Sequence, residues 1–349
     1  MAAIAREAGV GKATVSLALR NDPRLRLATR ERIQEVAARM GYQANAVVSN
    51  LMAQLRASRS PKYQSTIGVL NASPSRDILE KNHTFRAWTG GIRDRSGELG
   101  YSTDDFWLHE PGVGIERLRQ ILRARSIRGV VIAAVLEHRQ LPPEFDILWQ
   151  DLACVVVGIR PERPALHFAC NDQFSTAQHT AWELERLGYR RPGLVIEPAI
   201  ETNIDHRFSA GFYAGKSRAE MAASIPMMDF HPGGEGNFRK WVEKNRPDVI
   251  VCTHPEVREW LGRLGLECPR DIGLVHLDLT PELDGWSGMK QNNDVVGAFA
   301  VDLVIGQLHR NETGIPDRPK CMMIESQWVP GTTLRSAPPK TIANHRPHF

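Results

Sequence analysis

The chain has few cysteines, and no two of them stand at the spacing of a metal or redox site. Its five cysteines are scattered over 349 residues without a Cys-x-x-Cys motif. This set predicts free thiols in a reducing compartment, with Cys154, Cys170 and Cys252 buried because they fall within apolar runs. The chain also lacks a transmembrane-length apolar run, and Met1 opens no secretory signal. These absences argue against a membrane or exported protein and predict a cytoplasmic one.

Motifs that carry catalysis are missing as well. The sequence contains no phosphate-binding Gly-x-x-x-x-Gly-Lys, no Gly-x-Ser-x-Gly elbow and no His-Glu-x-x-His zinc motif. The glycine-rich stretch 232–236 is expected to be a loop, and neither His179 nor His206 stands at metal-ligand spacing. We therefore expect no enzyme activity, no cofactor and no metal.

Positive charge is concentrated at the start of the chain. Residues 1–62 contain eleven Lys and Arg against four Asp and Glu, a net charge of +7. The whole chain carries only +4, so the remainder is negative, at −3. A basic N-terminal module in a weakly charged protein is typical of phosphate binding, and DNA is favoured over an anionic membrane because no apolar anchor accompanies it.

Residues 5–19 have the pattern of a helix-turn-helix. Ala5 and Ala8 are small enough for two helices to cross closely. Gly9 supplies the backbone freedom that a tight turn needs, and Val10 fills the angle between the helices. The second helix begins with Lys12, Ala13, Thr14, Ser16 and Leu17, at the end that enters a major groove in such motifs. A small helical hairpin without a ligand is the alternative, and the local charge favours DNA binding.

A third helix is predicted over residues 29–40. Ile33, Val36, Ala37 and Met40 recur with helical spacing and form one apolar face, and a glycine at position 41 ends the helix. The following stretch 45–54 is too short to be a stable helix alone. It is either a disordered linker or a helix that forms only on contact with a partner.

These residues support a family resemblance. Residues 3–56 resemble the DNA-binding head and hinge of the LacI/purine-repressor family of bacterial transcription factors. The matching residues are Ala8-Gly9-Val10, Thr14-Val15-Ser16, Asn21, Thr29-Arg30-Glu31, Gly41-Tyr42, Asn45 and Leu51. The resemblance implies that Lys12 and Ala13 read base edges and that Leu51 of each subunit of a homodimer wedges open a base step in the minor groove. The implied DNA contacts are Lys12, Ala13, Thr14, Ser16, Leu17, Asn21, Arg26, Thr29, Asn45 and Leu51.

The head also departs from the family pattern. Leu17 stands where many members have a base-reading arginine, which predicts an apolar contact there, with a thymine methyl as the candidate. Ala44 replaces the usual hinge proline, and Arg26 replaces the serine that usually caps the third helix. Ala3 stands where an aspartate commonly caps the first helix, so either the start is truncated or the head is marginally folded without DNA. The operator sequence is therefore not inherited from the family.

The rest of the chain alternates between short apolar runs and amphipathic stretches. Strands are predicted at 67–70, 129–135, 154–159, 194–197, 227–230, 249–253 and 273–277. Helices are predicted at 85–99, 115–123, 174–187, 207–222, 237–244, 256–264 and 295–310. This alternation predicts an α/β body of two lobes with doubly wound parallel sheets, which bind ligands beyond the carboxyl ends of their strands.

Residues 65–335 resemble the effector-binding and dimerisation domain of the same family, which has a periplasmic-binding-protein-like (type I) fold. The resemblance implies one lobe over about 65–161 and 290–325 and another over about 162–289 and 326–335. A helix-turn-helix domain at 1–43 and a hinge helix and linker at 44–64 precede this body, and a flexible tail at 336–349 follows it.

Candidate effector contacts follow from the same resemblance. Arg207 precedes a Gly-aromatic pair, as the family's effector arginine does, and Asp278 matches its hydroxyl-binding carboxylate at a strand end. His254 also follows a strand, although a lone histidine is more often a packing residue. Gly158 stands where some sugar-binding members have an acid, which argues for a different ligand. The predicted effector set is Arg207, Asp278, His254, Trp286, Trp88 and Asn71, with the two tryptophans as apolar platforms.

The sequence therefore predicts a homodimeric, sequence-specific transcriptional regulator, a repressor by expectation, that binds a pseudo-palindromic operator. The expected effector is a sugar or sugar-like metabolite that alters DNA affinity by moving the lobes. A regulator of a purine or other non-sugar metabolite remains an alternative. An architectural DNA-binding protein without an effector is another, although it would hardly need so large a body.

Overall fold

A computed structural model describes residues 2–19, 24–40, 65–133, 139–216 and 224–336 of the chain. The chain divides into two compact units, each with its own sheet, and the first unit also includes the N-terminal head. The first comprises Met1–Ala169 and Asn293–Met322, and the second Cys170–Asn292 and Met323–Phe349. Within the described residues, no helix has the length and apolar character needed to cross a membrane.

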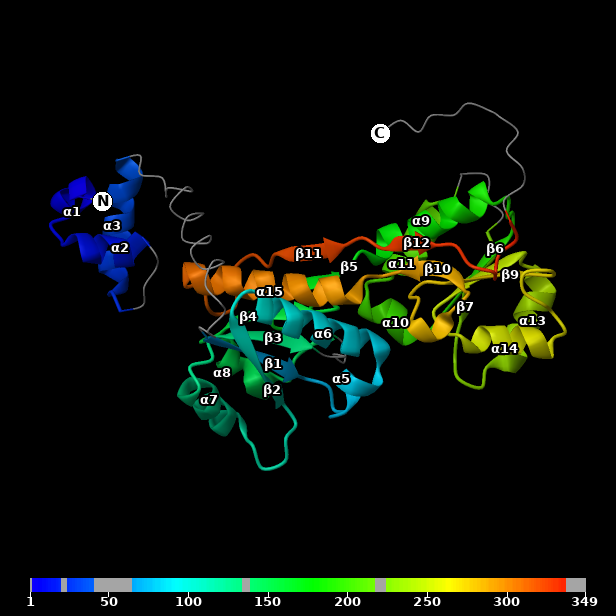
Figure 1. Cartoon of the computed structure of the whole chain (residues 1–349), viewed down its shortest axis with the longest axis horizontal. Coiled ribbons are helices and arrows are strands. Elements are labelled where there is room, and N and C mark those ends of the chain that lie inside the picture. The colour runs from blue at the N-terminus through cyan, green and yellow to red at the C-terminus, as the bar shows by residue number, and fades with distance from the viewer. Residues whose placement is uncertain (1, 20–23, 41–64, 134–138, 217–223, 337–349) are drawn as a thin grey trace. The chain divides into compact units, whose positions relative to one another are not determined.

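The N-terminal head consists of the helices α1 (Ala2–Glu7), α2 (Lys12–Leu19) and α3 (Leu27–Arg39) (Figure 1). Its small core is formed by Ile4, Ala5, Ala8, Val15, Ala18, Ile33, Val36 and Ala37. Gly9 has φ of +64°, so the predicted turn glycine is confirmed. Met40, expected on the buried face, is 46% exposed because α3 ends at Arg39 and Met40 is its C-cap.

The first unit contains a six-stranded sheet in the order β11-β5-β4-β3-β1-β2. Its strands are β1 (Ser65–Asn71), β2 (Tyr101–Trp107), β3 (Gly129–Ala133), β4 (Ala153–Val157), β5 (His167–Asn171) and β11 (Cys321–Ile324). The pairs from β2 through β1, β3 and β4 to β5 are all parallel, as predicted. The sequence missed β2, an edge strand whose Ser-Thr-Asp-Asp segment shows no apolar alternation.

Helices lie on both faces of this sheet. α6 (His83–Glu98) and α15 (Asn293–Arg310) pack together on one face (Figure 1). The other face carries α7 (Ile115–Ala124) and α8 (Asp146–Trp149), and the short helices α5 (Ile78–Lys81) and η2 (Pro143–Phe145) complete this unit.

The second unit contains a sheet in the order β12-β10-β9-β8-β6-β7. Its strands are β6 (Pro192–Ile196), β7 (Met228–Asp229), β8 (Val249–Cys252), β9 (Gly273–His276), β10 (Ser287–Lys290) and β12 (Gln327–Val329), and only β12 is antiparallel to its neighbour. Its helices are α9 (Gln173–Arg186), α10 (Pro198–Asn203), α11 (Arg207–Ala214), α13 (Glu235–Asn245), α14 (Glu256–Arg263) and η3 (Pro281–Leu283).

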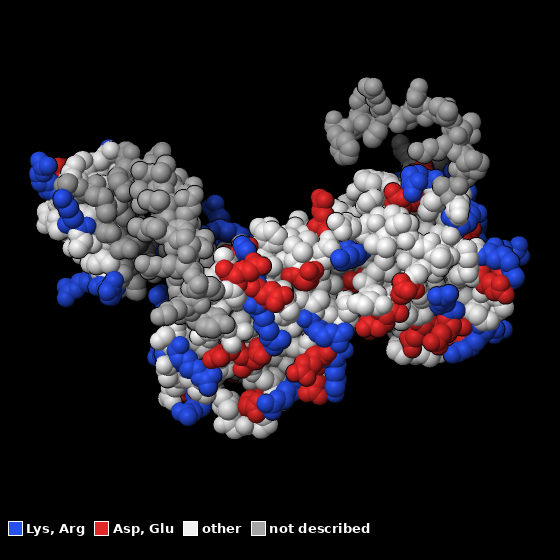
Figure 2. Space-filling model, in the orientation of Figure 1, with Lys and Arg blue, Asp and Glu red and all other residues white. Residues whose placement is uncertain are grey.

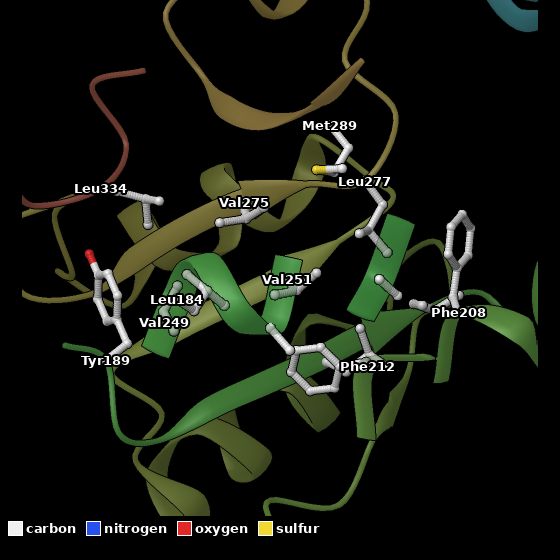
Figure 3. Packing of buried hydrophobic residues seen from close by; sticks show 14 of the residues in the cluster. Leu184, Tyr189, Phe208, Phe212, Val249, Val251, Val275, Leu277, Met289 and Leu334 are labelled. Carbon is white, nitrogen blue, oxygen red and sulfur yellow. The ribbon is translucent and has the colours of Figure 1, made fainter. Parts of the chain in front are cut away.

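Two hydrophobic clusters hold this second sheet between its helices. Leu184 of α9 and Phe208 and Phe212 of α11 pack on one face against strand residues such as Val251 (Figure 3). Phe238 of α13 and Trp260 of α14 pack on the other face. The described residues thus confirm the predicted doubly wound arrangement.

The boundaries between the units differ from those expected from the resemblance. The first crossing was expected near 160–164, but it lies between residues 169 and 170 because β5 pairs with β4 in the first sheet. The second lies at the start of α15, and the third between residues 322 and 323. The predicted helix 207–222 ends earlier, at Ala214, and residues 217–223 lie outside the described part. The hinge and tail remain predictions for the same reason.

α6 and α15 touch backbone to backbone because each has a glycine at their crossing. A Cβ atom on Gly91 would lie 1.8 Å from the carbonyl oxygen of Asp294, and one on Gly297 would lie 2.1 Å from that of Trp88. These reciprocal contacts join two segments of the first unit that are far apart in the sequence.

This contact predicts opposite effects for two adjacent glycines of α6. Gly91→Ala should destabilise the protein by about 1–3 kcal/mol, because the backbone of α15 must move. Gly90→Ala should be stabilising by up to about 1 kcal/mol, because nothing lies within 4 Å of its Cβ position and alanine favours the helix. Denaturant unfolding of the two variants measures the difference, and equal effects would contradict the close crossing.

Candidate nucleic-acid interface and effector site

The first turn of α2 presents the residues predicted to read bases. Lys12 and Ala13 are exposed, whereas Thr14 and Leu17 are partly buried. Val15 and Ala18 are buried in the head core and fix the helix on the other side. Gln34 of α3 donates its side-chain N–H to the carbonyl of Ala18 at 2.9 Å, which ties the two helices together. The exposed face therefore begins at the helix N-terminus, as groove entry requires.

The remaining predicted DNA contacts are described unevenly. Arg26 is the exposed N-cap residue of α3 and makes no side-chain capping bond, so the cap that serine would provide is missing. Thr29 is partly buried in the first turn of α3. Ser16 lies within α2, but its side chain is outside the described part, as are Asn21, Asn45 and Leu51.

The charge that the sequence places in the head is visible on its surface. Figure 2 shows mainly Lys and Arg among the charged side chains of the described head residues on the face in view. This face suits a polyanion, because Lys and Arg that approach phosphates release condensed counterions.

Two candidate polar residues, His254 and Asp278, follow parallel strands of the second unit. His254 follows β8, and its Nε2 lies 3.1 Å from Oε2 of Glu197, which follows β6. Its ring stacks on Phe230, which follows β7, with centroids 3.9 Å apart and planes at 6°. Glu197 and Phe230 were not among the predicted site residues, and their only signal in the sequence is their position at the ends of the predicted strands 194–197 and 227–230. The histidine is therefore held at the carboxyl edge by a carboxylate and an aromatic ring.

Asp278 lies beyond β9, at the same edge. Its backbone N–H donates to Nδ1 of His276 at 3.1 Å. The His276 ring is 4% exposed, and burial lowers its pKa to about 4, so the ring is neutral at neutral pH. This neutral acceptor holds the backbone turn that carries the Asp278 carboxylate.

Arg207 is the first residue of α11. Its guanidinium Nη1 lies 3.4 Å from Sδ of Met323, where the chain has returned to the second unit. The helix start is held by Glu201, which is 1% exposed and accepts hydrogen bonds from the backbone N–H and hydroxyl of Ser209 at 3.3 and 2.6 Å. His206, just before Arg207, has a left-handed φ of 56°. Glu201 therefore positions the arginine, a role without a sequence motif.

Trp286 does not offer the open platform that the sequence favoured. It is 6% exposed within the hydrophobic cluster under α13 and α14, and its ring meets His276 edge-on at 5.8 Å. Arg258 covers it at 5.6 Å. Its position is that of a core packing residue.

Trp88 is also 6% exposed, in α6 of the first unit. Its indole N–H donates to Oδ1 of Asn293 at 3.2 Å. A Cβ on Gly158 would lie 2.1 Å from its Cη2, and Gly158 has φ of +98°. The indole ring and the backbone conformation thus account for the glycine, and the expectation of a different ligand stays a prediction.

Asn71, at the end of β1, is engaged within its own loop. Its amide nitrogen donates to the carbonyls of Ser75 and Arg76, both at 3.0 Å, and its oxygen accepts from the N–H of Ser73 at 3.0 Å. It is 3% exposed and serves to close this loop.

The cysteines do not form a site. Cys154, Cys170 and Cys252 are buried, as predicted, and burial raises the pKa of the Cys252 thiol to about 12. Among the residues that the structure describes, no group of His, Cys, Asp and Glu is arranged to hold a metal ion.

Comparison with known proteins agrees with this architecture. Residues 1–45 match the model of the bacterial regulatory proteins, lacI family. The HTH-type transcriptional regulator PtxS of Pseudomonas putida is 25% identical over 330 residues, which cover 90% of this chain and 91% of that protein. The head of this chain is thus similar to the DNA-binding head of the lacI-family regulators, and nearly the whole chain is similar to a transcriptional regulator.

Solved structures of two transcriptional regulators share its fold over nearly the whole chain. The lac repressor dimer bound to operator and the anti-inducer ONPF has a TM-score of 0.59 at 18% identity. The transcriptional regulator CelR in complex with cellobiose has a TM-score of 0.57 at 18% identity. Each match covers 95% of this chain and 98% of the other. The predicted helix-turn-helix head and periplasmic-binding-protein-like body are confirmed.

The buried His276 predicts a specific pH dependence of stability. Its pKa is about 4 when folded and near 6.5 when exposed, so between these values the unfolded chain binds the additional proton. The contribution of His276 to the free energy of unfolding should therefore fall by up to about 3 kcal/mol as the pH drops from about 6.5 to about 4. The variant His276→Asn keeps a hydrogen-bond acceptor for the N–H of Asp278. Between pH 7 and pH 5 its free energy of unfolding should decrease less than that of the wild type. The exposed-residue variant His231→Asn is the control, and an unchanged loss in His276→Asn would refute the assignment.

Proposed function

We propose that the chain is a cytoplasmic, homodimeric, ligand-responsive repressor that binds a pseudo-palindromic operator. The observation that supports this proposal most directly is the exposure of α2. Lys12 and Ala13 in its first turn are exposed, while Val15 and Ala18 on its other side are buried in the core of the head. A helix held on one side and open at its N-terminus can enter a major groove. Two such heads in a symmetric dimer would read two related half-sites.

Support for the dimer comes from the fold. One solved structure with this fold is the lac repressor dimer on its operator. The body is far larger than DNA binding alone needs, and it is built as two separate compact units. A shift between two units gives an effector a way to change the spacing of the heads, with a coupling of typically about 1–3 kcal/mol.

We further propose that the effector is a small carbohydrate or sugar-like metabolite bound at the carboxyl edges of the sheets. The CelR structure with this fold is a complex with cellobiose. In the second unit, His254 follows β8, Asp278 follows β9, and Arg207 begins α11. Their side chains supply hydrogen-bond donors and acceptors suited to hydroxyl groups. Strand ends of open α/β sheets are the usual ligand-binding positions.

Selection of bound fragments from genomic DNA tests the operator hypothesis. The full chain should enrich a palindromic sequence, and Lys12→Ala should weaken binding to it by about 10- to 100-fold through loss of a base contact. Arg39→Ala removes an exposed cation of α3 away from the α2 N-terminus and should have a much smaller effect. Equal losses in the two variants, or no enriched palindrome, would overturn sequence-specific binding by α2.

Calorimetric titration of a panel of sugars tests the effector hypothesis. A sugar that binds the wild type should bind Arg207→Ala at least about 10-fold more weakly, because a guanidinium makes charge-assisted hydrogen bonds. Arg239→Ala, an exposed change on α13, should bind the sugar normally. Silence across the sugars with binding of a purine or an amino acid would exclude the sugar proposal.

A further inference from the structure

A second basic segment lies in the body of the protein, far from the head in sequence. Residues 115–128 contain five arginines and one glutamate, although the chain after residue 62 carries a net negative charge. The segment comprises α7 and the turn that leads into β3. Leu118 and Leu122 bury one side of the helix, while Arg117, Arg123 and Arg125 are exposed. Figure 2 shows Lys and Arg side chains over the region that α7 occupies in Figure 1.

Ion pairing neutralises only part of this charge. Arg119 and Arg123 share the single carboxylate of Asp151, at 2.7 and 2.6 Å, and their hydrogen bonds hold the pKa of that carboxyl below its usual value. Arg125 pairs with Asp104 at 2.9 Å. Two guanidiniums on one carboxylate leave a net positive charge at this place.

Arg117 and Arg128 have no ion pair among the described residues. Arg117 lies in the first turn of α7, where a cation is unfavourable because the helix dipole is positive at that end. Arg128 follows the helix and is exposed. Favourable interaction with the helix dipole therefore explains why an arginine stands in the last turn of α7, but it does not explain Arg117 or Arg128.

The strand register places Arg128 at the end of the first sheet to which the head is joined. Gly129 pairs with Ile67 in parallel, so Arg128 lies beside Thr66 near the beginning of β1. Lys320 lies at the same end, because its carbonyl accepts from the N–H of Phe168 in β5, just before β11 begins. We call this end of the sheet, with Arg128 and Lys320, the basic edge. The first strand of the sheet, β1, begins at this end, and in the sequence it directly follows the segment 41–64 that joins the body to the head.

We propose that the basic edge binds backbone phosphates of the DNA that flanks the operator. This inference rests on the proposed operator binding by the head, which brings duplex DNA to the covalent attachment point of this edge. Arginine suits the task because its guanidinium binds phosphate oxygens in a bidentate manner. Such contacts carry no sequence information and add affinity that depends on salt and on duplex length.

The double variant Arg128→Gln, Lys320→Gln tests this proposal in the full chain. Two duplexes carry the operator recovered by fragment selection, one of about 20 base pairs for two half-sites and one extended by flanks on both sides. Affinity for the extended duplex should fall, and the slope of log K against log salt should become shallower by about 2, since each lost phosphate contact contributes about 0.9. Affinity for the short duplex should remain within about twofold of wild type.

A matched control removes the same number of exposed cations from the second unit. The double variant Arg239→Gln, Lys240→Gln changes α13 and should leave both slopes as in the wild type. An unchanged slope for the edge variant on the extended duplex, or equal losses on both duplexes, would overturn the proposal. So would an equal change in the control, which would reflect net charge alone.

A further measurement separates failure of phosphate binding by the basic edge from failure of the operator hypothesis. If no palindrome is recovered, the same variants are compared on a long random-sequence duplex at low salt. A shallower slope in the edge variant alone would support phosphate binding by this edge even though specific recognition by α2 had failed. Wild-type slopes there would refute it, and an acidic protein partner would then be the remaining candidate for this surface.

Discussion

The close crossing of α6 and α15 is the constraint on which the first unit depends. Gly91 and Gly297 let the two backbones touch, so a helix near position 90 and one near position 297 become a single layer on the sheet. The same contact brings Asn293 to the indole of Trp88, which in turn occupies the space beside Gly158. A chain that leaves this unit after β5 and returns at α15 is thereby closed into one compact body. Small residues at one crossing thus decide how the carboxyl edge of the sheet is built.

In the second unit the carboxyl edge depends on buried polar groups rather than on glycine. Glu201 secures the start of α11 and hence Arg207, and the neutral ring of His276 secures the turn that carries Asp278. Glu197 and Phe230 hold His254 from two sides. Each candidate contact residue therefore has a supporting group, and such support keeps a binding geometry fixed before the ligand arrives.

Charge is divided between two parts of the molecule with different roles. Residues 1–62 carry a net charge of +7, and Lys12 is exposed at the N-terminus of α2, where the proposed base contacts are made. The basic edge lies beside the end of an amphipathic helix, α7, on which two arginines share one carboxylate. One surface would read sequence and the other would add affinity that is independent of it, because phosphates are the same along the whole duplex.

The sequence by itself determined the head and the alternating α/β body, because helix periodicity, turn glycine and charge are local properties. It also located the strand ends after which His254 and Asp278 lie. It missed β2 because an edge strand needs no apolar alternation, and it placed the first unit boundary too early because pairing of β5 with β4 is a long-range choice. Only the tertiary structure showed that Trp286 is a core residue, that Gly158 accommodates Trp88, and that Glu201 and Glu197 serve as supports. Those roles depend on which residues meet across the fold, and no local pattern records them.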